Sequence, residues 1–102
     1  MARQTITGIP RAKAFLEATV RVYDAPHGRD FAFGMTVIDK RPTKVFISLR
    51  SKATKVIDDW KKIDEPGMPS VGDVLDARIC TDVQGRNYPF AVYWQKSSVA
   101  KL

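Results

Sequence analysis

Two phenylalanines, Phe31 and Phe33, are separated by a single alanine in the stretch HGRDFAFGMTV, with Arg29 just before them. Residues two apart on a β-strand lie on the same face, so the two rings lie side by side. Such a pair either fills a core or forms a surface on which flat ligands such as nucleobases stack. Strict alternation gives Met35 and Val37 the same face, as in an ordinary core strand, and the pattern alone leaves both interpretations open.

A third phenylalanine, Phe46, lies opposite the aliphatic residues of its own strand. In the segment VFISL, Val45, Ile47 and Leu49 share one face and already account for the buried side. Phe46 takes the other face, and we therefore interpret it as a binding contact.

Basic residues crowd the turn that precedes Phe46. Lys40, Arg41 and Lys44 lie close together in the segment DKRPTK, where they either contact phosphate or form a plain solvated turn. The chain as a whole has 17 Lys and Arg against 11 Asp and Glu, which gives a formal charge of +6. A basic balance of this size favours a polyanionic partner such as nucleic acid.

Residue types that perform catalysis are scarce in the chain. It has one cysteine, Cys80, and one histidine, His27, and it contains no Gly-rich phosphate loop, nucleophile elbow or metal-ligand spacing. We therefore predict a protein that is not an enzyme, with no catalytic residues, no metal site and no cofactor. Because a single cysteine cannot form an internal disulfide, a reducing compartment, the cytoplasm, fits best.

Alternation and turn signals divide the chain into strands and one helix. The predicted strands cover residues 15–23, 31–38, 45–49, 71–82 and 88–94. Between the third and fourth strands, Val56, Trp60 and Ile63 recur at helical spacing, which predicts a helix over residues 52–64. This is the element order of the oligonucleotide/oligosaccharide-binding (OB) barrel, an all-β fold, although an SH3-like barrel or a small α+β sheet has the same count of elements.

The length of 102 residues is that of one domain. We assign residues 15–95 to it, with a basic N-terminal arm over residues 1–14, whose order the sequence leaves open, and a short C-terminal tail over residues 96–102. No apolar run has the length of a secretory signal or a membrane span, so no membrane partner is expected.

Four segments, taken in chain order, resemble the cold-shock domain family. They are ATVRVYDA (18–25), similar to the family's first strand GTVKWFNA; RDFAF (29–33), similar to the KGFGF motif; KVFIS (44–48), similar to DVFVH; and GDVLDARI (72–79), similar to GQKVEFEV. The resemblance covers roughly residues 18–93, and it implies a five-stranded antiparallel OB barrel.

The resemblance also implies functional residues. In cold-shock domains the aromatic residues of these motifs form a platform on which single-stranded bases stack, and Phe31, Phe33 and Phe46 match them. Arg21 and Arg29 match lysines of the family. On this resemblance exposure of the Phe31 and Phe33 rings is expected, together with a bulge or kink near Gly34 that returns Met35 or Val37 to the other face.

Several positions depart from the family pattern. Val22 stands where the family has a stacking tryptophan, and Ser48 stands where it has a histidine. Asp30 and Ala32 replace glycines that let bases approach closely. Affinity and the choice between RNA and DNA are the properties that these departures affect most.

The predicted function is binding of single-stranded RNA or DNA, as a nucleic-acid chaperone, a single-strand-binding protein or a regulator, by a monomer or weak homo-oligomer. The predicted site consists of Arg21, Arg29, Phe31, Phe33, Lys40, Arg41, Lys44 and Phe46. The alternative is an adaptor that docks a partner protein through the same aromatic face.

Overall fold

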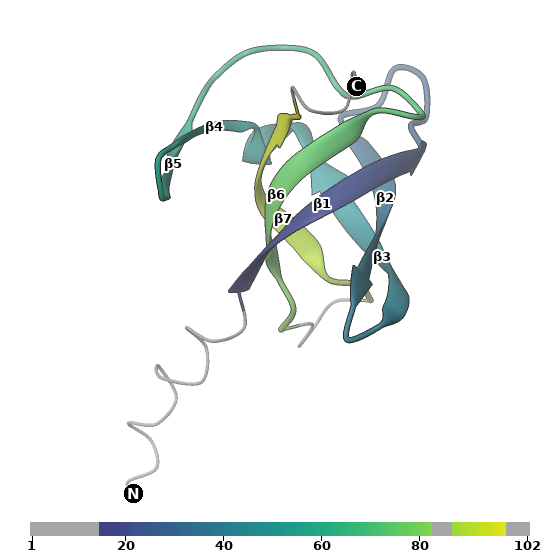
Figure 1. Cartoon of the computed structure of the whole chain (residues 1–102). Helices are drawn as coiled ribbons and strands as arrows, with labels where there is room; N and C mark the ends of the chain where they lie inside the picture. The colour runs from purple at the N-terminus through teal and green to yellow at the C-terminus, as the bar shows by residue number, and fades with distance from the viewer. Residues whose placement is uncertain (1–14, 83–86, 98–102) are drawn as a thin grey trace, which may run out of the picture.

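The computed structural model describes residues 15–82 and 87–97, and within these ranges five strands close into an all-β barrel (Figure 1). The barrel strands are β1 (Phe15–Asp24), β2 (Phe31–Ile38), β3 (Arg41–Ser48), β6 (Val74–Cys80) and β7 (Phe90–Lys96). Their order around the barrel is β1-β2-β3-β7-β6, with β6 pairing back to β1. The predicted arm over residues 1–14 and residues 98–102 of the predicted tail lie outside the described residues.

The barrel is mixed, because β3 and β7 run parallel where Phe46 pairs with Phe90. Every other neighbouring pair in the barrel is antiparallel. The predicted fully antiparallel barrel is therefore wrong in this detail. The reason is geometric: strand directions cannot alternate all the way round a closed ring with an odd number of strands, so at least one pair must be parallel.

The helix predicted over residues 52–64 is also wrong. This segment follows a 3-10 turn, η2 (Leu49–Ser51), and forms a hairpin of β4 (Ala53–Val56) and β5 (Asp59–Lys62). Ile57, in the hairpin turn, has a φ of 59°, which lies outside the right-handed helical region. The β-branched Thr54 and Val56 favour the extended backbone of β4, and only Trp60 of the predicted helical stripe is buried.

Trp60 attaches the β4–β5 hairpin to the barrel. Its indole ring stacks on the Tyr93 ring, with centroids 5.8 Å apart and planes inclined by 10°. Its Nε1–H donates to a carboxylate oxygen of Glu17 at 3.2 Å, and the Lys55 backbone N–H donates to the Gln95 side-chain oxygen at 3.0 Å. The periodicity that suggested a helix thus reflects one anchoring tryptophan in a strand.

Glu17 is the polar centre of this attachment. Its carboxylate contacts the Arg78 guanidinium and lies 3.4 Å from the Lys55 ammonium. Partial burial by itself raises the pKa of this carboxyl, but hydrogen bonds from Arg78 and Trp60 and the charges of Arg78 and Lys55 outweigh it and lower the pKa. The contribution of Glu17 to stability is therefore present near neutral pH and is lost as the pH falls through the lowered folded-state pKa.

The interior of the barrel is filled from four of its strands, and β2 contributes only small side chains to it. Trp94 on β7 is the largest fully buried residue, and its Nε1–H donates to the Ser48 carbonyl at 2.7 Å. From β2 the inward residues are Ala32, Gly34 and Thr36. The other fully buried large side chains are Val20, Val22, Val45, Ile47, Leu75 and Ile79.

We predict that Gly34→Ala destabilises the protein. A Cβ at position 34 would lie 2.3 Å from Val20 Cγ1 and 3.1 Å from both the Arg21 carbonyl oxygen and Ile47 Cδ1. Overpacking of this kind costs about 1–3 kcal/mol, measurable by urea denaturation. The control is Met35→Ala, because Met35 is the next residue of β2 and its side chain points outward; this substitution should lower the unfolding free energy less. An unchanged unfolding free energy for Gly34→Ala would contradict this packing.

Candidate nucleic-acid interface

The rings of Phe31 and Phe33 lie on the outer face of β2, outside the core. The residues between and after them, Ala32 and Gly34, are buried, so the phenylalanines alternate outward and are half-buried. Exposure needs no kink at Gly34, because β2 alternates regularly along its length and Met35 also points outward, 39% exposed. The irregularity in this pair of strands lies in β1 instead.

Phe46 joins these two rings from the neighbouring strand, because Phe33 and Phe46 are directly paired between β2 and β3. The ring centroids of Phe31 and Phe46 are 6.0 Å apart with near-parallel planes, and the Phe33 ring meets Phe46 edge-on at 5.7 Å. Tyr88, which precedes β7, adds a fourth ring at 5.6 Å from Phe33. We call Phe31, Phe33, Phe46 and Tyr88 the aromatic cluster.

The aromatic cluster holds one cation in place. The Lys44 ammonium lies 4.4 Å from the ring centroids of both Phe33 and Tyr88, and 3.5 Å from the Tyr88 hydroxyl oxygen. Removal from water alone would lower the Lys44 pKa, but hydrogen bonds and charge interactions with Tyr88 and Tyr23 raise it. Lys44 is therefore positively charged at neutral pH and is fixed against the rings.

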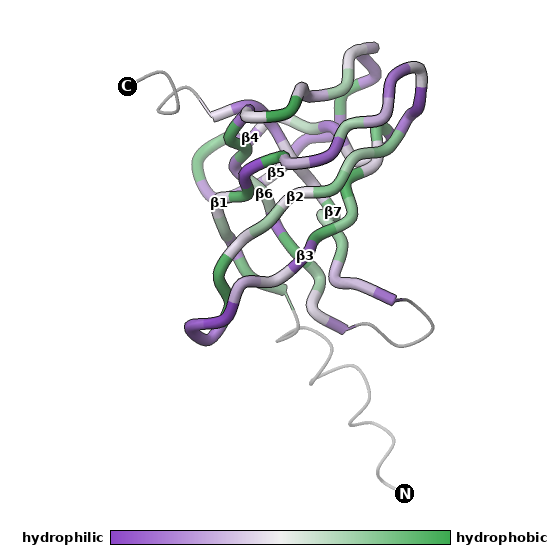
Figure 2. Tube along the Cα trace, turned by 90° about the vertical axis from the view of Figure 1, so that its right-hand side faces the viewer, coloured by the Kyte–Doolittle hydropathy of each residue, from purple (hydrophilic) through white to green (hydrophobic). Residues whose placement is uncertain are grey.

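The structure places the other predicted cations at different distances from the cluster. Arg21 is on the outer face of β1, paired with Met35, and Arg29 is exposed in the β1–β2 loop, two residues before Phe31. Lys40 and Arg41 are exposed at the β2–β3 turn, purple in Figure 2. At about 3.3 Å per residue this turn is roughly 17–23 Å from the cluster, so these two residues are separated from the rings.

Sequence reasoning did not include two aromatic residues of this face in the site. Tyr88 lies in the segment before β7, and its contact with Phe33 brings together segments far apart in the chain. Tyr23, 42% exposed, interacts with Lys44. The signal that identifies Tyr23 is alternation: it follows the buried Val22 on β1, so its side chain points outward with that of Arg21.

Two of the departures from the cold-shock pattern, Val22 and Ser48, have structural roles here. Val22, at the family's tryptophan position, is buried in the core. Ser48, at the histidine position, accepts a hydrogen bond from the Arg50 backbone N–H at 3.1 Å and caps the η2 turn. Neither side chain adds to the aromatic cluster.

Comparison of the chain with protein-family models, curated proteins and solved structures found no match. Within residues 15–82 and 87–97, no three His, Cys, Asp or Glu side chains gather in a way that would hold a metal ion. None of the helices that the structure describes has the length and apolar character needed to cross a membrane.

We predict that Phe46→Ala and Ile47→Ala differ sharply in their effect on stability. The two residues are adjacent on β3, but Ile47 is fully buried, whereas Phe46 is half-buried and packs against the Phe31 and Phe33 rings on the outer face. Ile47→Ala should cost about 2–5 kcal/mol of unfolding free energy. Phe46→Ala should cost about 1–2 kcal/mol, largely for lost ring contacts. Equal losses in urea denaturation would assign Phe46 to the core.

Proposed function

We propose that this protein is a non-enzymatic OB-type barrel that binds single-stranded RNA or DNA by stacking bases on the aromatic cluster. The observation that carries the proposal is the outward placement of Phe31, Phe33 and Phe46 on a barrel whose interior is already filled without them. Large rings at the surface of two adjacent strands leave apolar π-faces accessible to a ligand.

The topology supports the OB assignment. Three consecutive antiparallel strands, then two more that close the barrel through a parallel β3–β7 pair, give the order β1-β2-β3-β7-β6, which is compatible with that fold. In OB folds the face of the second and third strands binds oligonucleotides. The aromatic cluster lies on the same two strands, β2 and β3, of this barrel.

The distribution of charge supports a polyanionic ligand. Lys44 contributes a fixed cation among the rings, and Arg21 and Arg29 flank them. Lys40 and Arg41 then meet phosphates farther along the strand. Stacking accepts any base, since every base has a π-face, so binding tolerates many sequences. Docking of a partner protein on the same face is the alternative, and it predicts salt-resistant, partner-specific binding.

We expect Phe46→Ala to weaken binding of a labelled single-stranded homopolymer by about 1–3 kcal/mol, the contribution of one stacked base. Fluorescence anisotropy measures the change on the folded variant. Val56→Ala is the matched control, because Val56 is an exposed apolar residue of the hairpin, 53% exposed, outside the cluster. Duplex DNA should bind less well than single strands, because paired bases cannot lie on the rings. Equal affinity for duplex and single strand would rule out stacking as the binding mode.

The salt dependence of binding separates nucleic acid from a protein partner. If about three to five phosphates are neutralised, the log–log salt slope for a single strand is roughly −2 to −3.5. Combined replacement of Lys40 and Arg41 by Ala should make the slope shallower by about 1–1.5 and weaken all sequences alike. Replacement of Lys61 and Lys62, exposed on β5, is the charge-matched control and should leave the slope unchanged. A wild-type slope near zero would favour the protein-docking alternative.

A further inference from the structure

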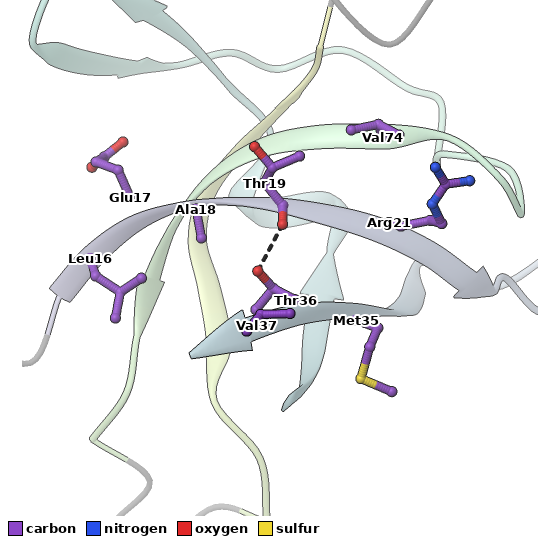
Figure 3. A pocket seen from close by; sticks show the side chains of 9 residues that line it. All are labelled: Leu16, Glu17, Ala18, Thr19, Arg21, Met35, Thr36, Val37 and Val74. Carbon is purple, nitrogen blue, oxygen red and sulfur yellow. Dashed lines mark hydrogen bonds between the residues drawn. The ribbon is translucent and has the colours of Figure 1, made fainter. Parts of the chain in front are cut away.

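The outer face of β2 continues beyond the aromatic cluster into an open groove between β1 and β2 (Figure 3). The groove has a volume of about 450 Å³. Leu16, Met35 and Val37 give it apolar walls, and Thr19 and Arg21 are polar residues at its rim. Val37, one residue before the end of β2, is 66% exposed, and with Met35, 39% exposed, it forms an exposed apolar patch beside the groove.

The groove exists because the β1–β2 ladder stops early. The last pair in this direction is Arg21 with Met35, although β1 begins at Phe15 and β2 ends at Ile38. Beyond that pair the strands separate, and the Thr36 hydroxyl donates to the Thr19 carbonyl at 2.7 Å in place of a backbone bond (Figure 3).

The separation leaves backbone groups of β1 directed into the groove. The Val22 N–H donates to the Asp73 carbonyl, and the Val22 carbonyl accepts from Gly72, so the backbone of Val22 faces the β6 side. Because successive residues of a strand alternate, the N–H and C=O groups of Thr19 and Glu17 face β2. Apart from the Thr36 hydroxyl bond, no strand partner faces them within the described residues.

The same alternation directs Val37 of β2 into the groove from the opposite side. The Phe46 N–H donates to the Pro89 carbonyl, so the backbone N–H and C=O of Phe46 point toward β7. Those of its neighbour Val45 therefore point toward β2, where Val45 pairs with Gly34. Val37, three residues after Gly34, then presents its N–H and C=O toward β1. Within residues 15–82 and 87–97 these groups of Val37 have no ladder partner on β1.

We propose that this groove receives one base of the bound single strand and reads its hydrogen-bonding edge with the backbone groups of Glu17 and Val37 and with the backbone N–H of Thr19. The inference rests on the proposed function, to which it adds a base preference. The groove is continuous with the stacking surface, since Phe33, Met35 and Val37 alternate on one face of β2 over about 13 Å.

The chemistry of the groove fits a base better than it fits an added peptide strand. Met35 and Val37 offer apolar contact, and the Arg21 guanidinium can stack on a base or meet its phosphate. Backbone N–H and C=O groups side by side match the donors and acceptors of a base edge. An added strand would need a continuous edge, and the Thr36 hydroxyl already occupies the Thr19 carbonyl in its middle.

The test compares binding of deoxyadenylate, deoxycytidylate and thymidylate homopolymers of equal length by the full chain. We expect the wild type to prefer one of them over the weakest by about 5- to 150-fold, the discrimination given by a good hydrogen-bonded base contact. Val37→Trp, which places a ring in the groove at an exposed position, should reduce this ratio to near one. The control, Val56→Trp, adds the same ring on the hairpin and should keep the ratio.

The backbone amides provide a second readout that does not depend on the variant. In the wild type, the amide resonances of Glu17, Thr19 and Val37 should shift more with the preferred homopolymer than with the weakest. Wild-type binding without a preference, or a preference that Val37→Trp leaves intact, overturns the groove assignment while the proposed function stands. Failure of the wild type to bind any homopolymer overturns both.

Discussion

The close packing of β2 against its neighbours at Gly34 is the constraint on which the rest of the structure depends. Val20 from β1 and Ile47 from β3 approach this residue so closely that a single added carbon would collide with Val20 and crowd Ile47. Because Trp94 and the aliphatic residues fill the barrel, β2 can direct only Ala32, Gly34 and Thr36 inward. A shift of register by one residue would send Phe31 and Phe33 into that filled space, so the core itself holds the rings outside.

This constraint explains which parts of the site could be predicted from the sequence. The outward position of Phe46 could be predicted because its own strand supplies large aliphatic residues for the opposite, buried face. The outward position of Phe31 and Phe33 could not be predicted from the strand pattern, because the other face of their strand carries only the small residues Ala32 and Gly34. In that pattern the larger residues are usually the buried ones. The side chain that fills the space, Trp94, comes from the far end of the chain, and no local pattern reveals that it does so.

The same limit applies to the fold. Period-two patterns located the five barrel strands, and the predicted barrel closure agrees with the structure. The prediction of a helix over residues 52–64 was wrong because the spacing of Val56, Trp60 and Ile63 fits a helical stripe as well as it fits a hairpin with one buried tryptophan. What decides between the two is the stacking of Trp60 on Tyr93 and its bond to Glu17, which are contacts between distant segments. The presence of a parallel pair, by contrast, can be inferred from the strand count alone, because five strands in a closed ring cannot all be antiparallel to their neighbours.

In the proposed complex, β2 serves two purposes with one alternating pattern. Its first half carries Phe31 and Phe33, whose stacking is indifferent to base identity. The Lys44 ammonium already lies over the Phe33 and Tyr88 rings, where it can meet a phosphate of the stacked strand. The second half of β2 leaves the ladder with β1, and the freed backbone groups supply directional hydrogen bonds that stacking lacks. Affinity and base preference would then come from different halves of one strand. Substitutions at the exposed Val37 would change the base preference, and they would leave intact the packing at Gly34 that holds the stacking rings outside.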